Sequence, residues 1–120
     1  MHTHLQLRSD GIVQILYTDS FSFTIKDALE SADAMGELTN GVLYPILKIP
    51  GKNTIVDRET REFVAKGAGA RYSISEAFVL QSMAHKIFAN FYIRIDKPQK
   101  PTRFYNNFPS AEEWLRKFVK

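Results

Sequence analysis

Ser82 and His85 are a pair of residues whose types and spacing could support nucleophilic catalysis. They lie three positions apart, so on a helix they would share one face, as a nucleophile and its base must. Nucleophilic catalysis also needs an orienting acid and an oxyanion hole, and the sequence identifies neither. We therefore interpret Ser82 as a helix cap and expect no enzymatic activity, which leaves a Ser82/His85 hydrolase as the weakest of three functional hypotheses.

Two further patterns suggest ligands without completing a site. His2 and His4 would point the same way on a strand, but no third metal ligand can be identified. The glycine-rich residues 67–70 follow a predicted helix and precede a strand, whereas phosphate-binding glycine loops follow a strand and open a helix. We therefore predict no metal and no cofactor.

Hydroxyl and charged residues gather where another helix is predicted to begin. Asp57 is placed to cap a helix that runs to about Lys66, with Thr54 before it and Arg58 and Thr60 in its first turn. A phosphate on either threonine would be favoured by free backbone N–H groups and by the helix dipole. Asp57 already puts a negative charge there, so a capped helix is the simpler interpretation. We treat Thr54, Asp57, Arg58 and Thr60 as a candidate switch or partner surface.

The amino-acid composition excludes several classes of protein. The chain has 120 residues, 44% of them hydrophobic, and no cysteine, which excludes a disulfide scaffold, a thiolate metal site and a cysteine nucleophile. The net charge of +3 comes from scattered basic residues, so we expect no nucleic-acid partner. No apolar run approaches the roughly 18 residues of a membrane span, and no export signal is apparent. We expect a single domain over residues 1–120, located in the cytoplasm.

Periodicity predicts the elements that must position these residues. Thr24 and Asp27 form a capping box for the first helix, Asp10-Gly11 predicts a two-residue hairpin turn, and Pro45 predicts an edge or a bulge. Ser110 and Glu113 predict a second capping box. The expected elements are strands over 4–8 and 12–17, a helix after 24, a strand over 42–49, a helix over 57–66, a strand over 72–80, a helix from 82 to before 98, a strand over 102–105 and a helix from 110.

This order, β-β-α-β-α-β-α-β-α, predicts an α/β fold. Strands that are joined through helices form parallel crossovers, so we expect one sheet of about five strands with an initial β-hairpin and about four helices.

Aromatic residues are concentrated in the final third of the chain. Phe88, Phe91 and Tyr92 are candidates for an apolar pocket, and an excess of such residues could also form a homodimer surface. The helix over 82–98 is predicted to have one broad apolar face, made by Ala84, Ile87, Phe88, Phe91, Tyr92 and Ile95.

Four segments carry a resemblance to a known family. They are residues 90–98 (NFYIRIDKP), 101–105 (PTRFY), 110–115 (SAEEWL) and 58–61 (RETR). In their order along the chain they resemble the STAS domain of anti-sigma factor antagonists, and more closely its SpoIIAA-like (STAS/SEC14-type) bacterial relatives. The resemblance implies a STAS-like fold and a phosphorylated serine or threonine after the third strand, although the family's Asp-Ser pair is missing here.

The resemblance sets the order of the functional hypotheses. It favours a non-enzymatic regulatory or binding module that acts through protein partners. The alternative is a carrier of a lipid or another small apolar ligand, suggested by the aromatic helix and by the family's similarity to lipid-transfer folds.

Overall fold

A computed structural model describes residues 3–17, 22–51, 53–66 and 71–119. It confirms the α/β class, with a five-stranded mixed sheet and four α-helices. The elements are β1 (Thr3–Leu7), β2 (Val13–Tyr17), β3 (Ser22–Phe23), α1 (Ile25–Thr39), β4 (Tyr44–Ile49), β5 (Ile55–Val56), α2 (Arg58–Ala65), β6 (Ser73–Val79), α3 (Met83–Phe91), the π-helical turn η2 (Tyr92–Asp96), β7 (Thr102–Tyr105) and α4 (Phe108–Arg116).

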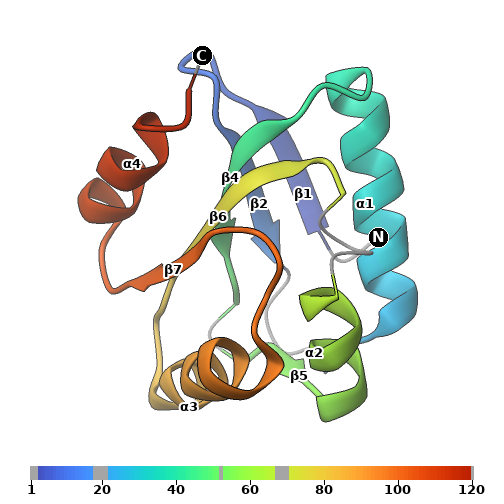
Figure 1. Cartoon of the computed structure of the whole chain (residues 1–120), viewed down its shortest axis with the longest axis vertical. Helices are drawn as coiled ribbons and strands as arrows, with labels where there is room; N and C mark the ends of the chain where they lie inside the picture. Colours follow the sequence, from blue (N-terminus) through green and yellow to red (C-terminus); the bar gives the residue numbers. More distant parts are fainter. Residues whose placement is uncertain (1–2, 18–21, 52, 67–70, 120) are drawn as a thin grey trace.

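The main sheet has the strand order β1-β2-β4-β6-β7 (Figure 1). β1 pairs with β2 in antiparallel orientation, and every later pair in this sheet is parallel. The sequence does not predict β3 and β5, because two residues are too short to establish a period. They pair with each other as a small separate parallel sheet, which sets Phe23 beside Val56.

The β1–β2 hairpin differs from the predicted two-residue turn. Arg8 donates its backbone N–H to the carbonyl of Ile12, and Gly11 donates to the carbonyl of Arg8. The loop between them is therefore three residues long, with Gly11 at a φ of 83° closing it. Such loops place glycine in the left-handed region after a tight turn, so the glycine signal is correct and the loop length is wrong.

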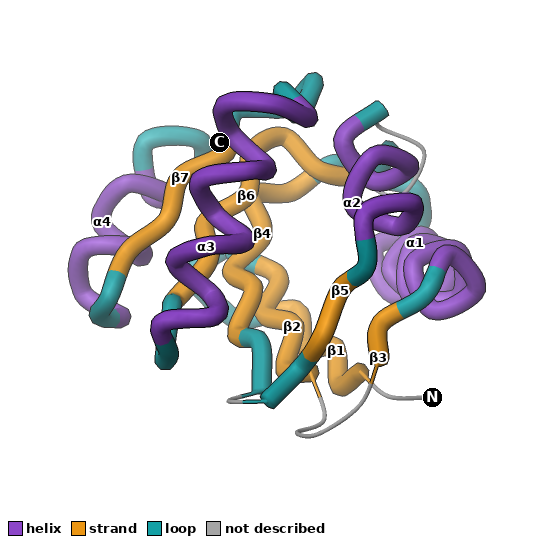
Figure 2. The backbone as a smooth tube through the Cα atoms, turned by 90° about the horizontal axis from the view of Figure 1, so that it is seen from below, coloured by secondary structure: helices purple, strands orange, loops and turns teal. Residues whose placement is uncertain are grey.

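The helices cover the two faces of the main sheet unequally. We call the face covered by α4 the packed face and the opposite one, covered by α1, α2 and α3, the cavity face; Figure 2 shows α4 across the sheet from α1 and α2. Strand alternation assigns the side chains to faces, so Leu47 and Ile49 meet α4 while Ile46 contacts the α1 side. The core of the packed face is Ile12, Leu47, Ile49, Ala77, Val79, Ala111, Trp114 and Leu115.

The helix starts follow the sequence at three of four positions. Thr24, Asp57 and Ser82 each accept a backbone N–H at the start of α1, α2 and α3, as predicted. The prediction for α4 is wrong: Asn107 is the cap and accepts from the N–H of Ser110, at 2.9 Å. Asn107 can cap there because the following Phe-Pro pair enters the helix directly, with proline in the first turn, where a missing N–H costs nothing.

The single broad apolar face predicted for α3 is also wrong. Phe88 and Tyr92 pack against the sheet, in a cluster with Phe78 and Phe104. Four other large apolar side chains, at positions four apart, share a second face that is open to solvent. Their exposed fractions are 69% for Met83, 55% for Ile87, 44% for Phe91 and 64% for Ile95.

Candidate functional site

A bulge between the two central strands determines which side chains reach the cavity face. Tyr44 of β4 pairs with Ser73 of β6, and the next residue, Pro45, pairs with Ser75, so β6 gains one residue at this point. Pro45 therefore lies at an irregularity of the ladder, as predicted from the missing N–H of proline. The extra residue also sets Ser73 and Glu76 on the same face of the sheet.

A buried ion pair lies at the centre of this face. The Lys48 ammonium of β4 donates to Oε1 of Glu76 at 2.9 Å, and the Ser73 hydroxyl donates to Oε2 at 2.9 Å. The two charged side chains are only 8% and 2% exposed. Burial, the largest single cause, disfavours the charged ammonium, but the charge of Glu76, its hydrogen bond to Lys48 and the two nearby phenols together outweigh burial and raise the pKa of Lys48 above its ordinary value. Lys48 is therefore protonated at every physiological pH.

Two tyrosines surround the ion pair. Burial raises the pKa of both Tyr17 and Tyr92, and both phenols interact electrostatically with Lys48 and Glu76, so the polar ends of the four side chains gather in one place. Tyr92 is 1% exposed. No hydrogen bond of either tyrosine hydroxyl is found within the described residues, and neither hydroxyl oxygen is among their buried unpaired atoms, so both reach open space.

A cavity of about 340 Å³ opens above this polar cluster. Its walls come from the main sheet, the short strands, α2 and α3. Most of the lining is apolar, and among the residues that the structure describes no aspartate or glutamate contributes to it. The lining residues are Tyr17, Phe23, Lys48, Pro50, Thr54, Val56, Arg61, Val64, Phe78, Leu80, His85, Ile87, Phe88, Phe91 and Tyr92.

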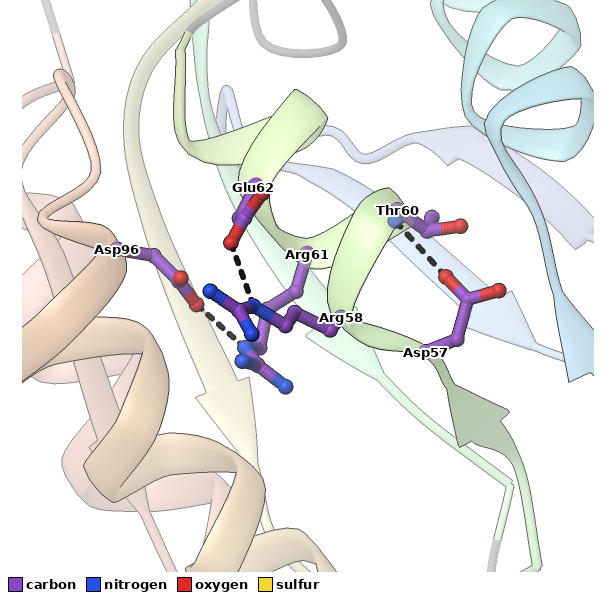
Figure 3. A network of polar contacts seen from close by, with 6 residues as sticks. All are labelled: Asp57, Arg58, Thr60, Arg61, Glu62 and Asp96. Atoms are coloured by element: carbon purple, nitrogen blue, oxygen red, sulfur yellow. Dashed lines mark hydrogen bonds and ion pairs between the residues drawn. The ribbon is translucent and has the colours of Figure 1, made fainter.

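A second ion pair joins the two helices across the cavity. Arg61 of α2 donates to the Asp96 carboxylate at the end of η2, and their side chains are 14% and 1% exposed. The Arg61 guanidinium also lies 5.2 Å from the centre of the Phe91 ring. Figure 3 shows this pair beside the exposed Arg58–Glu62 pair on α2. Arg61 thus fixes the distance between α2 and the aromatic helix.

Three of the aromatic residues singled out in the sequence meet at the cavity. Phe88, Phe91 and Tyr92 all contribute to its lining, and the Phe88 and Tyr92 rings stack with their centres 5.3 Å apart. The turn to the π-helical η2 starts at Tyr92 and ends at Lys97, whose N–H donates to the Tyr92 carbonyl. Side chains from one helix therefore form a large part of one wall.

The four residues of the candidate switch surface are separated by the structure. Thr54 lines the cavity, and Asp57 caps α2 through its bond from the Thr60 N–H at 2.8 Å, which lowers the pKa of the carboxyl group. Arg58 is exposed and pairs with Glu62. Thr60 is only 2% exposed, so the expectation that it is presented at the surface is wrong; its position in the first turn faces inward.

Ser82 and His85 do not form a nucleophile and base. Ser82 Oγ accepts the backbone N–H of His85 at 3.3 Å, which is a capping contact. The imidazole Nδ1 accepts from the Gln81 N–H at 3.1 Å, and Nε2 lies 3.0 Å from the Gly51 carbonyl, to which it donates. Burial lowers the pKa of His85, and the bond to Gly51 partly opposes that shift. The ring therefore fastens α3 to the loop after β4.

Sequence reasoning missed Tyr17, Lys48 and Glu76 of the polar cluster, and also Arg61 in the cavity wall. A signal was present: Lys48 and Glu76 each stand inside an otherwise apolar strand, and a charge is rarely buried unless it is paired. The described residues contain no group of three or more potential ligands that could hold a metal ion.

Fold and site together define a small α/β protein with an apolar cavity over a buried ion pair. The chain belongs to the family described as a domain of unknown function, DUF7793, whose model matches residues 5–119. The comparisons with curated proteins and with solved structures found no match. In the described part of the chain, no helix is both long and apolar enough to cross a membrane.

Proposed function

We propose that this protein is a non-enzymatic binding module that takes up a small apolar molecule in the cavity between α2, α3 and the sheet. The observation that carries the proposal is the cavity, whose volume of about 340 Å³ lies at the small end of the range typical of ligand sites, roughly 300–1,000 Å³. Its mostly apolar walls and few polar groups are also typical of such sites.

A packing defect is a poor explanation for a space of this size. Protein interiors are close-packed, and voids larger than a water molecule are few. The cavity is lined by residues from eight described elements, including both strands of the short β3–β5 sheet. The arrangement is better explained as a site that a ligand completes.

Native mass spectrometry after gentle purification tests this proposal. We expect a noncovalently bound small molecule on the wild type and none on Val64→Trp, because a large ring at this lining position would occupy the cavity. The matched control is Val42→Trp at a half-exposed position outside the lining, which should keep the ligand. An apoprotein in all three samples, with no thermal stabilisation by apolar probe compounds, would reject the proposal.

A regulatory module that acts through protein partners is the second candidate function. The outward-facing Met83, Ile87, Phe91 and Ile95 favour it, because contiguous exposed apolar side chains often mark interfaces. Two of them, Ile87 and Phe91, also line the cavity, so an occupied cavity could alter this surface. Light scattering of the wild type and of Ile87→Lys tests the simplest case, a homodimer that the charge disrupts; a monomer mass for both rejects it.

Two sequence-based hypotheses stay predictions beside this proposal. The relationship to STAS domains is compatible with a sheet whose strands follow one another in chain order. Of the two candidate phosphorylation sites, Thr54 is now the better one, since Thr60 is buried. Phosphate incorporation by a cognate kinase that persists in Thr54→Ala would exclude it.

A further inference from the structure

The floor of the cavity carries more hydrogen-bond donors than acceptors. The Lys48 ammonium has three N–H groups, and Glu76 takes one of them. In the described residues no other hydrogen bond from the Lys48 side chain is found, and none is found for the hydroxyls of Tyr17 and Tyr92. Tyr92 is 1% exposed as a residue, yet its hydroxyl oxygen is not among the buried atoms without a partner in the described residues, so it reaches open space, where a bound molecule can accept its O–H.

The two carboxylates described in this region are turned away from the cavity. Glu76 uses Oε1 for Lys48 and Oε2 for Ser73, and its side chain is 2% exposed. Asp96 is similarly enclosed behind Arg61, at 1% exposed. Lys48 and Arg61 line the cavity, whereas neither carboxylate does. A bound molecule would therefore lie closer to the two cations than to the anions that balance them.

From this asymmetry we infer that the ligand is an apolar carboxylic acid, bound as its carboxylate. This inference rests on the proposed binding function. The carboxylate accepts hydrogen bonds from Lys48, Tyr17 and Tyr92, and charge-assisted bonds of this kind are roughly twice as strong as neutral ones. An amine or another cationic head group would be repelled by Lys48 and Arg61, which lie nearer to the cavity than the carboxylates that balance them.

The aromatic wall determines how the rest of the ligand lies. Phe78 contacts Lys48 with its ring centre 5.2 Å from the ammonium, and Phe88 stacks on Tyr92. Ile87 and Phe91 line the cavity and are also 55% and 44% exposed, so they lie where it meets solvent. The carboxylate thus points inward to the ion pair, and the apolar body extends along α3 toward these two residues.

Isothermal titration calorimetry at pH 7.5 with decanoate and 1-decanol tests the inference, because the two probes share a chain length and differ in the head group. We expect the wild type to bind decanoate about tenfold more tightly or better, the factor that one charge-assisted hydrogen bond supplies. Tyr92→Phe should lose about fivefold in decanoate affinity and little in decanol affinity. Tyr105→Phe, at a tyrosine outside the lining, is the matched control and should bind like the wild type.

The double variant Lys48→Met/Glu76→Gln removes both charges together, so no unpaired charge stays buried and the Ser73 hydroxyl keeps an acceptor. It should bind the two probes within about twofold of each other. Equal binding of both probes by the wild type would overturn the carboxylate inference and leave the binding function standing. An unchanged preference for decanoate in the double variant would overturn the role of Lys48. If neither probe binds, the proposed function fails together with the inference.

Discussion

The two faces of the main sheet differ in how completely the space between the sheet and its helices is filled. The packed face fills the space under α4 with aliphatic side chains and Trp114, and its core residues Leu47, Ala77, Ala111 and Leu115 are fully buried. The cavity face, under α2 and α3, leaves about 340 Å³ open and buries a charged pair in place of two apolar residues.

The difference separates stability from function. A buried ion pair stabilises a fold less than well-packed apolar residues of the same volume would, because both charges lose their hydration. An open cavity similarly forgoes dispersion contacts along its lining. The ion pair and the cavity both reduce the free energy of unfolding, and both lie on the cavity face. This is the arrangement expected of a binding site that is supported by a well-packed face on the other side of the sheet.

The largest effect should come from breaking the buried pair. Glu76→Gln leaves Lys48 charged and without an anion, which should lower the free energy of unfolding by about 3–5 kcal/mol. On the packed-face side, Glu112 of α4 pairs with Arg8 while both side chains are about one-fifth exposed, so Glu112→Gln should cost about 0–1 kcal/mol. Urea unfolding of the two variants measures the contrast; similar small losses would show that Lys48 does not depend on Glu76.

The second-largest difference between the two faces is expected when a side chain on each is replaced by a larger one. Ala111 is fully buried on the packed face, so Ala111→Leu should cost about 1–3 kcal/mol through overpacking. Val64→Phe adds bulk beside open space and should cost less than about 1 kcal/mol, since the ring can enter the cavity without displacing neighbours. Chemical unfolding tests both; equal losses would mean that the cavity is not open in solution.

The start of α4 provides a smaller test of how the packed face is held. Asn107→Ala removes the side chain that accepts the Ser110 N–H and should lower the free energy of unfolding by about 1 kcal/mol. Ser110→Ala, at the position predicted from the sequence as the cap, should change it by less than about 0.5 kcal/mol. Thermal unfolding ranks the two variants, and the reverse ranking would restore the sequence-based cap.

Local rules explain which parts of the fold the sequence could predict. Thr24, Asp57 and Ser82 act within one helical turn, so their caps and the elements after them follow from neighbouring residues alone. The same rule applies to Asn107, but this cap was not predicted from the sequence, because Ser110 and Glu113 have the residue types and spacing of a capping box three residues later. The short strands β3 and β5 pair with each other although more than 30 residues of chain separate them, and no local sequence pattern predicts either strand.

The candidate site was predictable only in part for the same reason. Phe88, Phe91 and Tyr92 lie on one helix, so their spacing alone brings them together. Lys48 and Glu76 meet because β4 and β6 are neighbours, and Ser73 reaches Glu76 only through the bulge opposite Pro45. The register of two strands and the position of a bulge depend on how the strands pair in the folded protein. The periodicity of either strand alone does not predict them.

The smallest expected effect is a pH dependence confined to the cavity face, where His85 fastens α3 to the loop at Gly51; α4 contains no histidine. Burial lowers the pKa of His85 in the folded protein below the ordinary value of 6.5, so the unfolded chain binds the proton more readily. The contribution of the neutral ring to stability is therefore complete above pH 6.5 and is lost as the pH falls from there through the folded pKa. Urea unfolding at pH 7.5 and 5.5 should show a larger loss for the wild type than for His85→Gln, while His4→Gln, at an exposed position on β1, should behave like the wild type. An equal loss in the wild type and in His85→Gln would mean that the imidazole does not hold the cavity face together as its two backbone contacts indicate.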